Sequence, residues 1–313
     1  MDKRFTSVLY SMIGVVAIFA ILIFVLGNML GIARFQVDQA TLGLRFVFVF
    51  VGLLIVFAVY YFNKDSQAWE VGTREVVWMS IGAALYAVLS WFFNTTVFLV
   101  PSLSQVALRP AIAIPMFFGY AFGPVVGFFT GAVGNMFGDA ITGFGLYPQW
   151  SVGNGLIGFI SGIPLLFADR KKSMDTVLWI SGALALLTVV IFFTNRNETN
   201  LMFFDPNNNV FGDQPIALTA GISILIGFVL VLIVRFGFGK NVNIAAAVIW
   251  GMLGNIVGVG FAAISDIWIN GYSFPAAIVG EFLPAAGPNL IFAAILVPLL
   301  VVAYAAVQRQ SGR

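Results

Sequence analysis

The sequence of 313 residues is strongly apolar, and this decides the class of protein. Hydrophobic residues make up 60 % of it and charged residues 9 %, whereas a soluble domain carries about 25 % charged residues. The 15 basic and 13 acidic residues nearly balance, which excludes the dense basic surface that nucleic-acid binding needs. With no Cys and no His, thiol or imidazole catalysis, disulfides and Cys or His metal sites are excluded as well. We predict an all-α polytopic membrane protein.

Long uncharged stretches separate the few charged residues, and each can cross a hydrocarbon core of about 30 Å as a helix. The first stretch is too long for a secretory signal and is followed by no small-residue cleavage site, so we expect a retained helix. In chain order, about ten transmembrane helices are predicted, at 7–30, 44–62, 77–98, 106–122, 124–139, 150–168, 177–194, 215–235, 243–265 and 285–307.

The number of spans depends on the stretch 106–138, which could form one tilted helix or two short ones. The tripeptide Phe122-Gly123-Pro124 interrupts it, and proline removes a backbone donor and disfavours helical geometry in its predecessor. With two helices here, eleven of the fifteen basic residues fall on the side of both termini. The positive-inside rule assigns that side to the cytoplasm. We therefore expect a multi-pass protein of the cell membrane with both termini cytoplasmic.

The polar stretch 63–75 is the predicted boundary between two parts of the chain. Residues 1–63 would form an N-terminal two-helix transmembrane unit, and residues 76–313 the remaining body. No low-complexity segment is present.

Small residues recur at helical spacing in two places, which lets helix backbones approach closely in lipid. Ala83 and Ala87 lie one turn apart in the third span. Packing within the chain is the default interpretation, and a docking face for another membrane subunit is the alternative for the alanine pair. The longer series consists of Gly119, Gly123, Gly127, Gly131 and Gly134.

Charged residues and amides collect on the predicted outer side. Polar residues at membrane depth are costly and usually functional. Arg109, Asp139, Asp266 and Glu281 fall at the outer ends of spans, where each alone would be a solvated end residue. Their neighbours on that side are amides and aromatic residues, namely Asn94, Asn135, Tyr147, Gln149, Trp150, Asn154, Trp268, Asn270 and Tyr272.

Amides also lie inside the spans. Asn154 and Asn255 are within helices, and Asn289 follows Pro284 and Pro288, which predicts a broken helix entry of the kind that lines transporter sites. A few amides between aromatic rings suit a flat heterocycle that stacks on the rings and bonds through its edge. We predict an outward-facing small-molecule site.

Catalysis has little support in the sequence. The segment from Phe236 to Lys240 is followed by Asn241 and lacks the first glycine of a phosphate-binding loop, so ATP binding in that mode is excluded. An intramembrane aspartyl enzyme would need two facing carboxylates, for which Asp139 and Asp266 are the plausible pair. This enzyme stays an open alternative, and we expect no cofactor and no metal.

Three ordered segments carry a family resemblance. Residues 122–128 read Phe-Gly-Pro-Val-Val-Gly-Phe and are followed by a Gly-x-x-Gly and by Asp139. This pattern, the helix at 150–159 and the helix from Gly254 to Asp266 are similar to the S component, the substrate-binding subunit, of energy-coupling-factor (ECF) vitamin transporters of the riboflavin type.

The resemblance implies a six-helix core and two additional helix pairs, at the N-terminus and at 177–235. The core helices would be 77–98, 106–122, 124–139, 150–168, 243–265 and 285–307. It implies that the last three core helices and the loop 99–105 capture substrate from outside, and that Ala83 and Ala87 dock on a transmembrane coupling subunit served by a pair of ABC ATPases. Asn135 replaces a family His, which leaves the substrate open, and the absence of His disfavours metal uptake.

The leading hypothesis is therefore a substrate-binding component that takes up a vitamin or vitamin precursor from outside. We expect Trp150, Asn154, Asn255 and Asn289 to contact the substrate. The rim charges or structural ties would be Arg109, Asp139 and Glu281. The alternative from another class is a membrane scaffold or sensor subunit that keeps the fold and does not transport.

Overall fold

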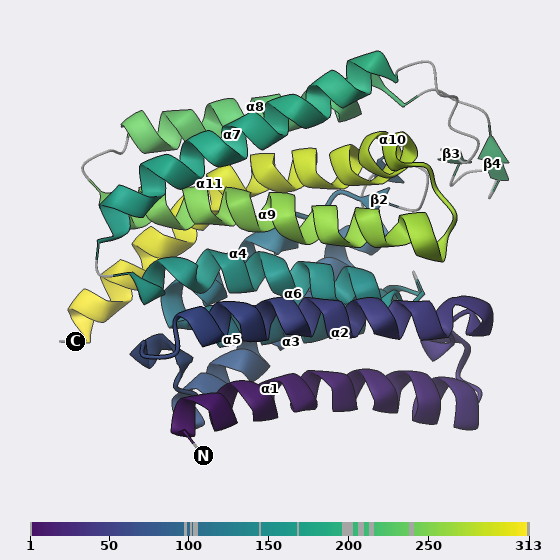
Figure 1. Cartoon of the computed structure of the whole chain (residues 1–313), viewed down its shortest axis with the longest axis horizontal. Helices are drawn as coiled ribbons and strands as arrows, with labels where there is room; N and C mark the ends of the chain where they lie inside the picture. The colour runs from purple at the N-terminus through teal and green to yellow at the C-terminus, as the bar shows by residue number, and fades with distance from the viewer. Residues whose placement is uncertain are drawn as a thin grey trace.

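The computed structural model describes residues 2–96, 99–100, 102, 106–143, 145–167, 169–195, 203–205, 210–212, 216–237 and 241–311. Long helices run side by side as a bundle, with both chain ends at one end of it (Figure 1). The helices are α1 (Lys3–Ala20, continued by η1, Ile21–Met29), α2 (Gln39–Phe62), α3 (Thr73–Thr96), α4 (Ala113–Phe122), α5 (Pro124–Thr142), α6 (Pro148–Gly162), α7 (Arg170–Thr194), α8 (Leu218–Gly237), α9 (Val242–Ile269), α10 (Phe274–Ala276, continued by η6, Ala277–Phe282) and α11 (Leu283–Gln310). Single helical turns are η2 (Ala33–Phe35), η3 (Gln67–Trp69), η4 (Pro110–Ile112) and η5 (Ile163–Leu166).

Two short antiparallel hairpins complete the described elements. Strand β1 (Leu99–Val100) pairs with β2 (Val106–Ala107), and β3 (Phe203–Asp205) pairs with β4 (Val210–Gly212). Labelled strands β2, β3 and β4 lie toward the end of the bundle opposite the termini (Figure 1).

The predicted fold class is confirmed. Among the described residues, seven helical segments are long and apolar enough to cross a membrane: Lys3–Met29, Gln39–Phe62, Thr73–Phe93, Ser173–Thr194, Leu218–Gly237, Val242–Ile269 and Phe274–Gln310. The remaining three predicted spans correspond to α4, α5 and α6, which are shorter or less apolar.

The chain divides at Gly123, as predicted. Helix α4 ends at Phe122, and α5 begins with Pro124 at its first position, where a missing N–H costs no hydrogen bond. Gly123 has φ +115°, a conformation that side-chain-bearing residues rarely adopt. The predicted start of this span at 106 is wrong, because residues 106–107 pair in β2 and helical structure begins only at η4.

The last span is continuous, which corrects the predicted broken entry beside Pro284 and Pro288. The helix runs from Phe274 to Gln310 and passes through the wider π-helical turn η6 directly before α11. Pro284 lies in the first turn of α11 and lacks a backbone donor. A π-helical turn changes the local register without ending the helix, and such turns are frequent at functional sites.

Helix α6 lies at the centre and packs on α5 and α9 through glycine. A Cβ atom on Gly127 would overlap the carbonyl of Gly158, and one on Gly153 would lie 2.6 Å from the carbonyl oxygen of Gly258. The backbones therefore touch directly, which confirms the close packing that the glycine spacing predicts. Every residue of α6 except Trp150 is buried.

Four other helices surround this centre. Helix α1 packs on α5, α2 on α6 and α9, α7 on α8 and α9, and α8 on α11. Helices α7 and α8 form one side of the bundle and α1 the opposite side (Figure 1). The N-terminal pair thus contacts the same central helices as the rest of the chain.

Candidate functional site

A buried ion pair joins the residue before η4 to the C-terminal half of α5. Asn135 and Asp139 are one turn apart and therefore share a face of α5. Arg109, which precedes η4, donates from Nη2 to Asp139 Oδ1 at 3.0 Å and from Nη1 to Asn135 Oδ1. Asn135 Nδ2 in turn donates to Asp139 Oδ2 at 2.7 Å. The Asp139 side chain is 7 % exposed, so both its oxygens are bonded inside the protein.

The same contacts extend to α3 and α6. Tyr86 is fully buried, donates to Asn154 Oδ1 at 2.8 Å and is hydrogen-bonded to Arg109. Asn135 Nδ2 also lies 3.1 Å from Ser151 Oγ. Helices α3, α5 and α6 and the segment before η4 thus meet at one set of hydrogen bonds. We call its members the polar network: Tyr86, Arg109, Asn135, Asp139, Ser151 and Asn154.

A second set of contacts centres on Asp266 near the C-terminal end of α9. Its two oxygens accept from Gln149 Nε2 at 3.1 Å and from Trp150 Nε1 at 2.8 Å. Gln149 Oε1 accepts from Arg45 Nη1 at 3.2 Å, and Arg45 Nε donates to Thr41 Oγ1 at 3.0 Å. Helix α2 therefore supplies a buried cation to the centre. We call this set the Asp266 cluster: Arg45, Gln149, Trp150 and Asp266.

Two tyrosines outside the helices adjoin the Asp266 cluster. The Arg45 guanidinium lies 5.2 Å from the centre of the Tyr147 ring. Tyr272 interacts electrostatically with Asp266, Glu281 and Tyr147. Burial raises the pKa of both tyrosines above the usual value, so each phenol stays a neutral hydrogen-bond donor at physiological pH.

Glu281 lies in the π-helical turn η6 and is completely buried. Burying a carboxyl group is costly unless it is hydrogen-bonded or paired, and π-helical turns are frequent at functional sites. The charge of Glu281 acts on Tyr147 and Tyr272, the two tyrosines that adjoin the Asp266 cluster. Of the four predicted outer charges, the structure pairs Arg109 with Asp139 and places Asp266 in a separate set of hydrogen bonds.

Asn255 and Asn289 lie deeper than these charges. Asn255 precedes Asp266 by eleven residues on α9, which is about 16 Å along a helix. Its Nδ2 donates to the carbonyl of Ala286 on α11 at 2.8 Å, and its fully buried Oδ1 accepts no hydrogen bond from any residue that the structure describes. Asn289 is 7 % exposed, and no hydrogen bond of its amide is present among the described residues. These two amides retain unused bonding capacity.

The two carboxylates of the possible aspartyl enzyme do not form a pair. Asp139 is bonded to Arg109 and Asn135, and Asp266 to Gln149 and Trp150. A catalytic pair would share one proton across facing oxygens. In the described part of the chain, no group of three or more acidic residues gathers as a metal site.

Ala83 and Ala87 face the interior. They are 6 % and 4 % exposed and pack on α5, where a Cβ on Gly134 would lie 2.9 Å from the carbonyl oxygen of Ala83. Both alanines are therefore occupied by packing within the chain. The accessible side of α3 instead carries larger apolar residues, namely Val77, Ile81, Leu85, Val88 and Trp91.

Sequence reasoning missed Arg45 and Tyr86 as members of the site. For Arg45 the available signal was its position one turn inside an apolar stretch, since a cation within a membrane span needs a partner. No comparable signal marks Tyr86, because its role depends on contacts with α4 and α6. Of the predicted loop 99–105, residues 101 and 103–105 lie outside the described residues.

Comparison with known proteins gives a consistent result. Residues 70–195 match the model of a family described as "ECF-type riboflavin transporter, S component". A UPF0397 protein of Vibrio atlanticus is 32 % identical over 174 residues, which are 54 % of this chain and 92 % of the relative. UPF0397 proteins of Aliivibrio fischeri and Aliivibrio salmonicida are 28 % and 29 % identical, covering 51 % of this chain and 87 % of each relative. No solved structure matches the chain.

Proposed function

We propose a transport function for this chain, because it belongs to the UPF0397 proteins, a family of S components of ECF-type transporters. It is thus a multi-pass membrane protein and the substrate-binding subunit of a transporter. Within that role, we propose that it captures a vitamin or vitamin precursor with a flat, mostly neutral heterocycle from the outer side, with both termini cytoplasmic.

The observation that carries this proposal is the unused bonding capacity of Asn255 and Asn289 below a polar outer end. The unpaired Asn255 Oδ1 and the Asn289 amide offer acceptors and donors to the edge of a heterocycle. Trp150 provides an aromatic surface above them, since its indole nitrogen is fixed by Asp266. A neutral ligand fits because the nearby charges already have partners within the chain.

Asn154, Arg109, Asp139 and Glu281 have supporting roles in this proposal. Asn154 presents its amide beside Trp150, to whose carbonyl its Nδ2 donates at 2.9 Å. The ion pair of Arg109 with Asp139 holds α4 against α5 at the rim. Glu281 would orient the phenols next to the entrance.

The proposed partners are a transmembrane coupling subunit and a pair of ABC ATPases, which the family name implies. Because Ala83 and Ala87 pack on α5, we place the docking surface on the exposed side of α3, around Ile81, Leu85 and Val88. These side chains are 41–56 % exposed and form a stripe at helical spacing.

A vitamin panel tests the proposal. The purified protein, mixed with water-soluble vitamins and their precursors one at a time, should show a rise in the unfolding temperature with at least one of them, because a ligand that binds only the folded state stabilises it. Stabilisation by none would overturn the proposal and leave the scaffold or sensor role.

Substitutions then locate the site. Asn255→Ala and Asn289→Ala should each weaken binding of the stabilising ligand about 5- to 150-fold, corresponding to about 1–3 kcal/mol for a lost buried hydrogen bond. The matched control is Asn63→Ala at the end of α2, since the Asn63 side-chain amide donates to the carbonyl of Val59 at 3.0 Å and its other hydrogen bonds are made by the backbone, which the substitution keeps. Equal affinity in all three variants would exclude the two deep amides from the site.

A further inference from the structure

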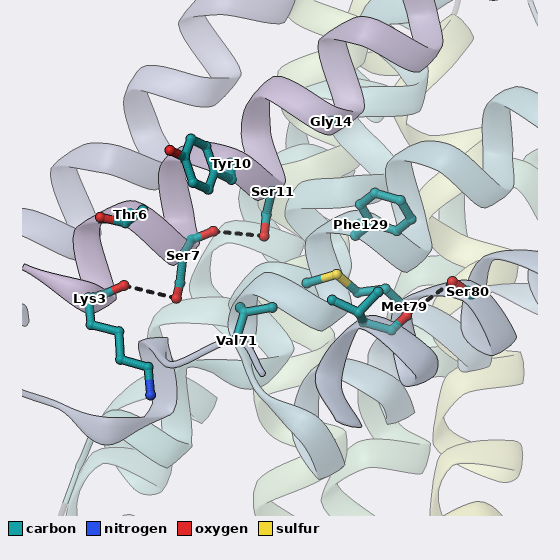
Figure 2. Close-up of a pocket in the computed structure, with 11 residues that line it drawn as sticks. Lys3, Thr6, Ser7, Tyr10, Ser11, Gly14, Val71, Met79, Ser80 and Phe129 are labelled. Atoms are coloured by element: carbon teal, nitrogen blue, oxygen red, sulfur yellow. Dashed lines mark hydrogen bonds between the residues drawn. The ribbon is translucent and has the colours of Figure 1, made fainter. Parts of the chain in front are cut away.

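A groove opens between α1 and α3, away from both the polar network and the Asp266 cluster. Helix α1 packs on α5 but barely touches α3, so the two helices flank α5 and leave a cavity of about 500 Å³ between them. Figure 2 shows α1 residues along one side of it and Phe129 of α5 beside Met79 and Ser80 of α3. Tyr10 and Val76 at its edges are 65 % and 52 % exposed, so the groove is open to its surroundings.

The interior of the groove is apolar even where serines line it. Ser7 and Ser11 donate to the carbonyls of Lys3 and Ser7 at 2.9 and 2.8 Å, and Ser80 donates to that of Val76 at 3.0 Å (Figure 2). Each hydroxyl is thus satisfied within its own helix. The groove can therefore be filled by a hydrocarbon without leaving these donors unpaired.

Gly14 marks the deeper part of the groove. A Cβ atom added at this position would meet no atom within 4 Å, so the space beside it is open. By contrast, the glycines at the centre of the bundle are in contact with backbone. Close packing of helices within this chain therefore does not explain Gly14.

One cation lies at the mouth of the groove. Lys3 is the charged residue among the described residues that line it, and it has no ion-pair partner in the described part of the chain. The acidic side chains nearby are engaged elsewhere: Glu75 pairs with Arg74 at 2.9 Å, and Asp2 accepts from Tyr60 at 3.3 Å and caps α1. An anionic group of a ligand would complement the charge of Lys3 at the mouth of the groove.

The volume decides between two kinds of occupant. A methylene group takes roughly the space of a water molecule, about 30 Å³, so a cavity of about 500 Å³ holds one acyl chain. A helix about 10 Å across with a rise of 1.5 Å takes about 120 Å³ per residue, so the same cavity holds only about one turn of a partner helix.

We propose that this groove binds one acyl chain of an anionic phospholipid from the leaflet around the N-terminus, with the lipid phosphate on Lys3. The long side chain of lysine reaches the headgroup level while its stem stays on apolar surface. Basic residues next to a membrane attract anionic headgroups. The site is independent of the proposed substrate site.

The test uses the full chain in detergent with mixtures of phosphatidylglycerol and phosphatidylcholine, and native mass spectrometry counts the lipids that stay bound. Gly14→Leu fills the groove and should remove one tightly bound lipid. The matched control is Gly43→Leu on α2, where a Cβ also meets no atom within 4 Å. This control should retain the lipid.

The charge is tested separately. Lys3→Gln should lower the preference for phosphatidylglycerol over phosphatidylcholine about fivefold, whereas Lys64→Gln, at an exposed lysine beyond α2, should not change it. Equal lipid retention in the two leucine variants, or an unchanged preference after Lys3→Gln, overturns the proposal. It is also overturned if Gly14→Leu keeps its lipid but loses a co-purified coupling subunit, because the groove then receives a protein helix.

Discussion

The glycine-rich central helices and the outer helices of this bundle differ in how much of their surface is buried against other helices. Of the residues in the most apolar window of α9, 78 % are buried, compared with 33 % for α1 and for α2. Outer helices face lipid and need apolar side chains all along their exposed sides. Helices at the centre face other helices, so α5 and α6 carry glycine, amides and a carboxylate. Apolar character therefore measures exposure to lipid and not the importance of a helix to the fold.

The largest expected effect comes from the charges of the centre. Asp139→Asn leaves Arg109, which cannot lose its proton, without its counter-ion inside the protein. We expect a loss of about 3–5 kcal/mol in the free energy of unfolding, as for other buried pairs that lose one partner. Denaturant unfolding of the purified protein measures it.

The control for this prediction is an ion pair of the outer helices. Arg235 on α8 lies 2.8 Å from Asp175 on α7, whose side chain is 50 % exposed. Asp175→Asn should therefore cost only about 0–1 kcal/mol. Equal losses in the two variants would contradict the contrast between centre and periphery.

A slightly smaller effect is expected from the glycine contacts. Gly127→Leu forces a side chain into the backbone of Gly158, and overpacking of this kind costs about 1–3 kcal/mol, with the upper end expected because backbone cannot turn aside. Thermal unfolding in detergent would show a lower midpoint. Gly43→Leu at the periphery meets open space and should leave that midpoint nearly unchanged, and a similar drop in both would refute the interpretation.

The smallest effect concerns a single hydroxyl group in the polar network. Tyr86→Phe removes the donor to Asn154 Oδ1 and the acceptor for Arg109 and keeps the ring in place, which should cost about 2 kcal/mol. The control is Tyr10→Phe, since the Tyr10 side chain lies at an exposed edge of α1. A loss no larger than that of this control would mean that the Tyr86 hydroxyl adds no stability.

Local signals in the sequence were sufficient for the number of helices and the division at Gly123. Proline chemistry and glycine spacing act within one or two turns, so they can be interpreted from neighbouring residues. The π-helical turn before Pro284 could not be predicted in this way. A helix break and a change of helical register both accommodate a residue that lacks a backbone donor, so the proline alone does not distinguish them.

Contacts between distant helices were the part that could not be predicted. Asp266 was expected at an outer helix end, but its bonds to Gln149 and Trp150 span more than a hundred residues. Likewise, which side of α3 faces inward depends on α5, so the positions of Ala83 and Ala87 followed only from the packing. The amides Asn255 and Asn289 were singled out by residue type and depth alone, and their role as ligand contacts stays a proposal.

The link from Arg45 through Gln149 to Asp266 fixes α2 to α6 and α9. If the core changes its orientation in the bilayer during a transport cycle, α1 and α2 must sweep through the lipid with it. Each cycle would then displace more lipid than a core without α1 and α2 would displace. A more viscous membrane would therefore lower the turnover rate.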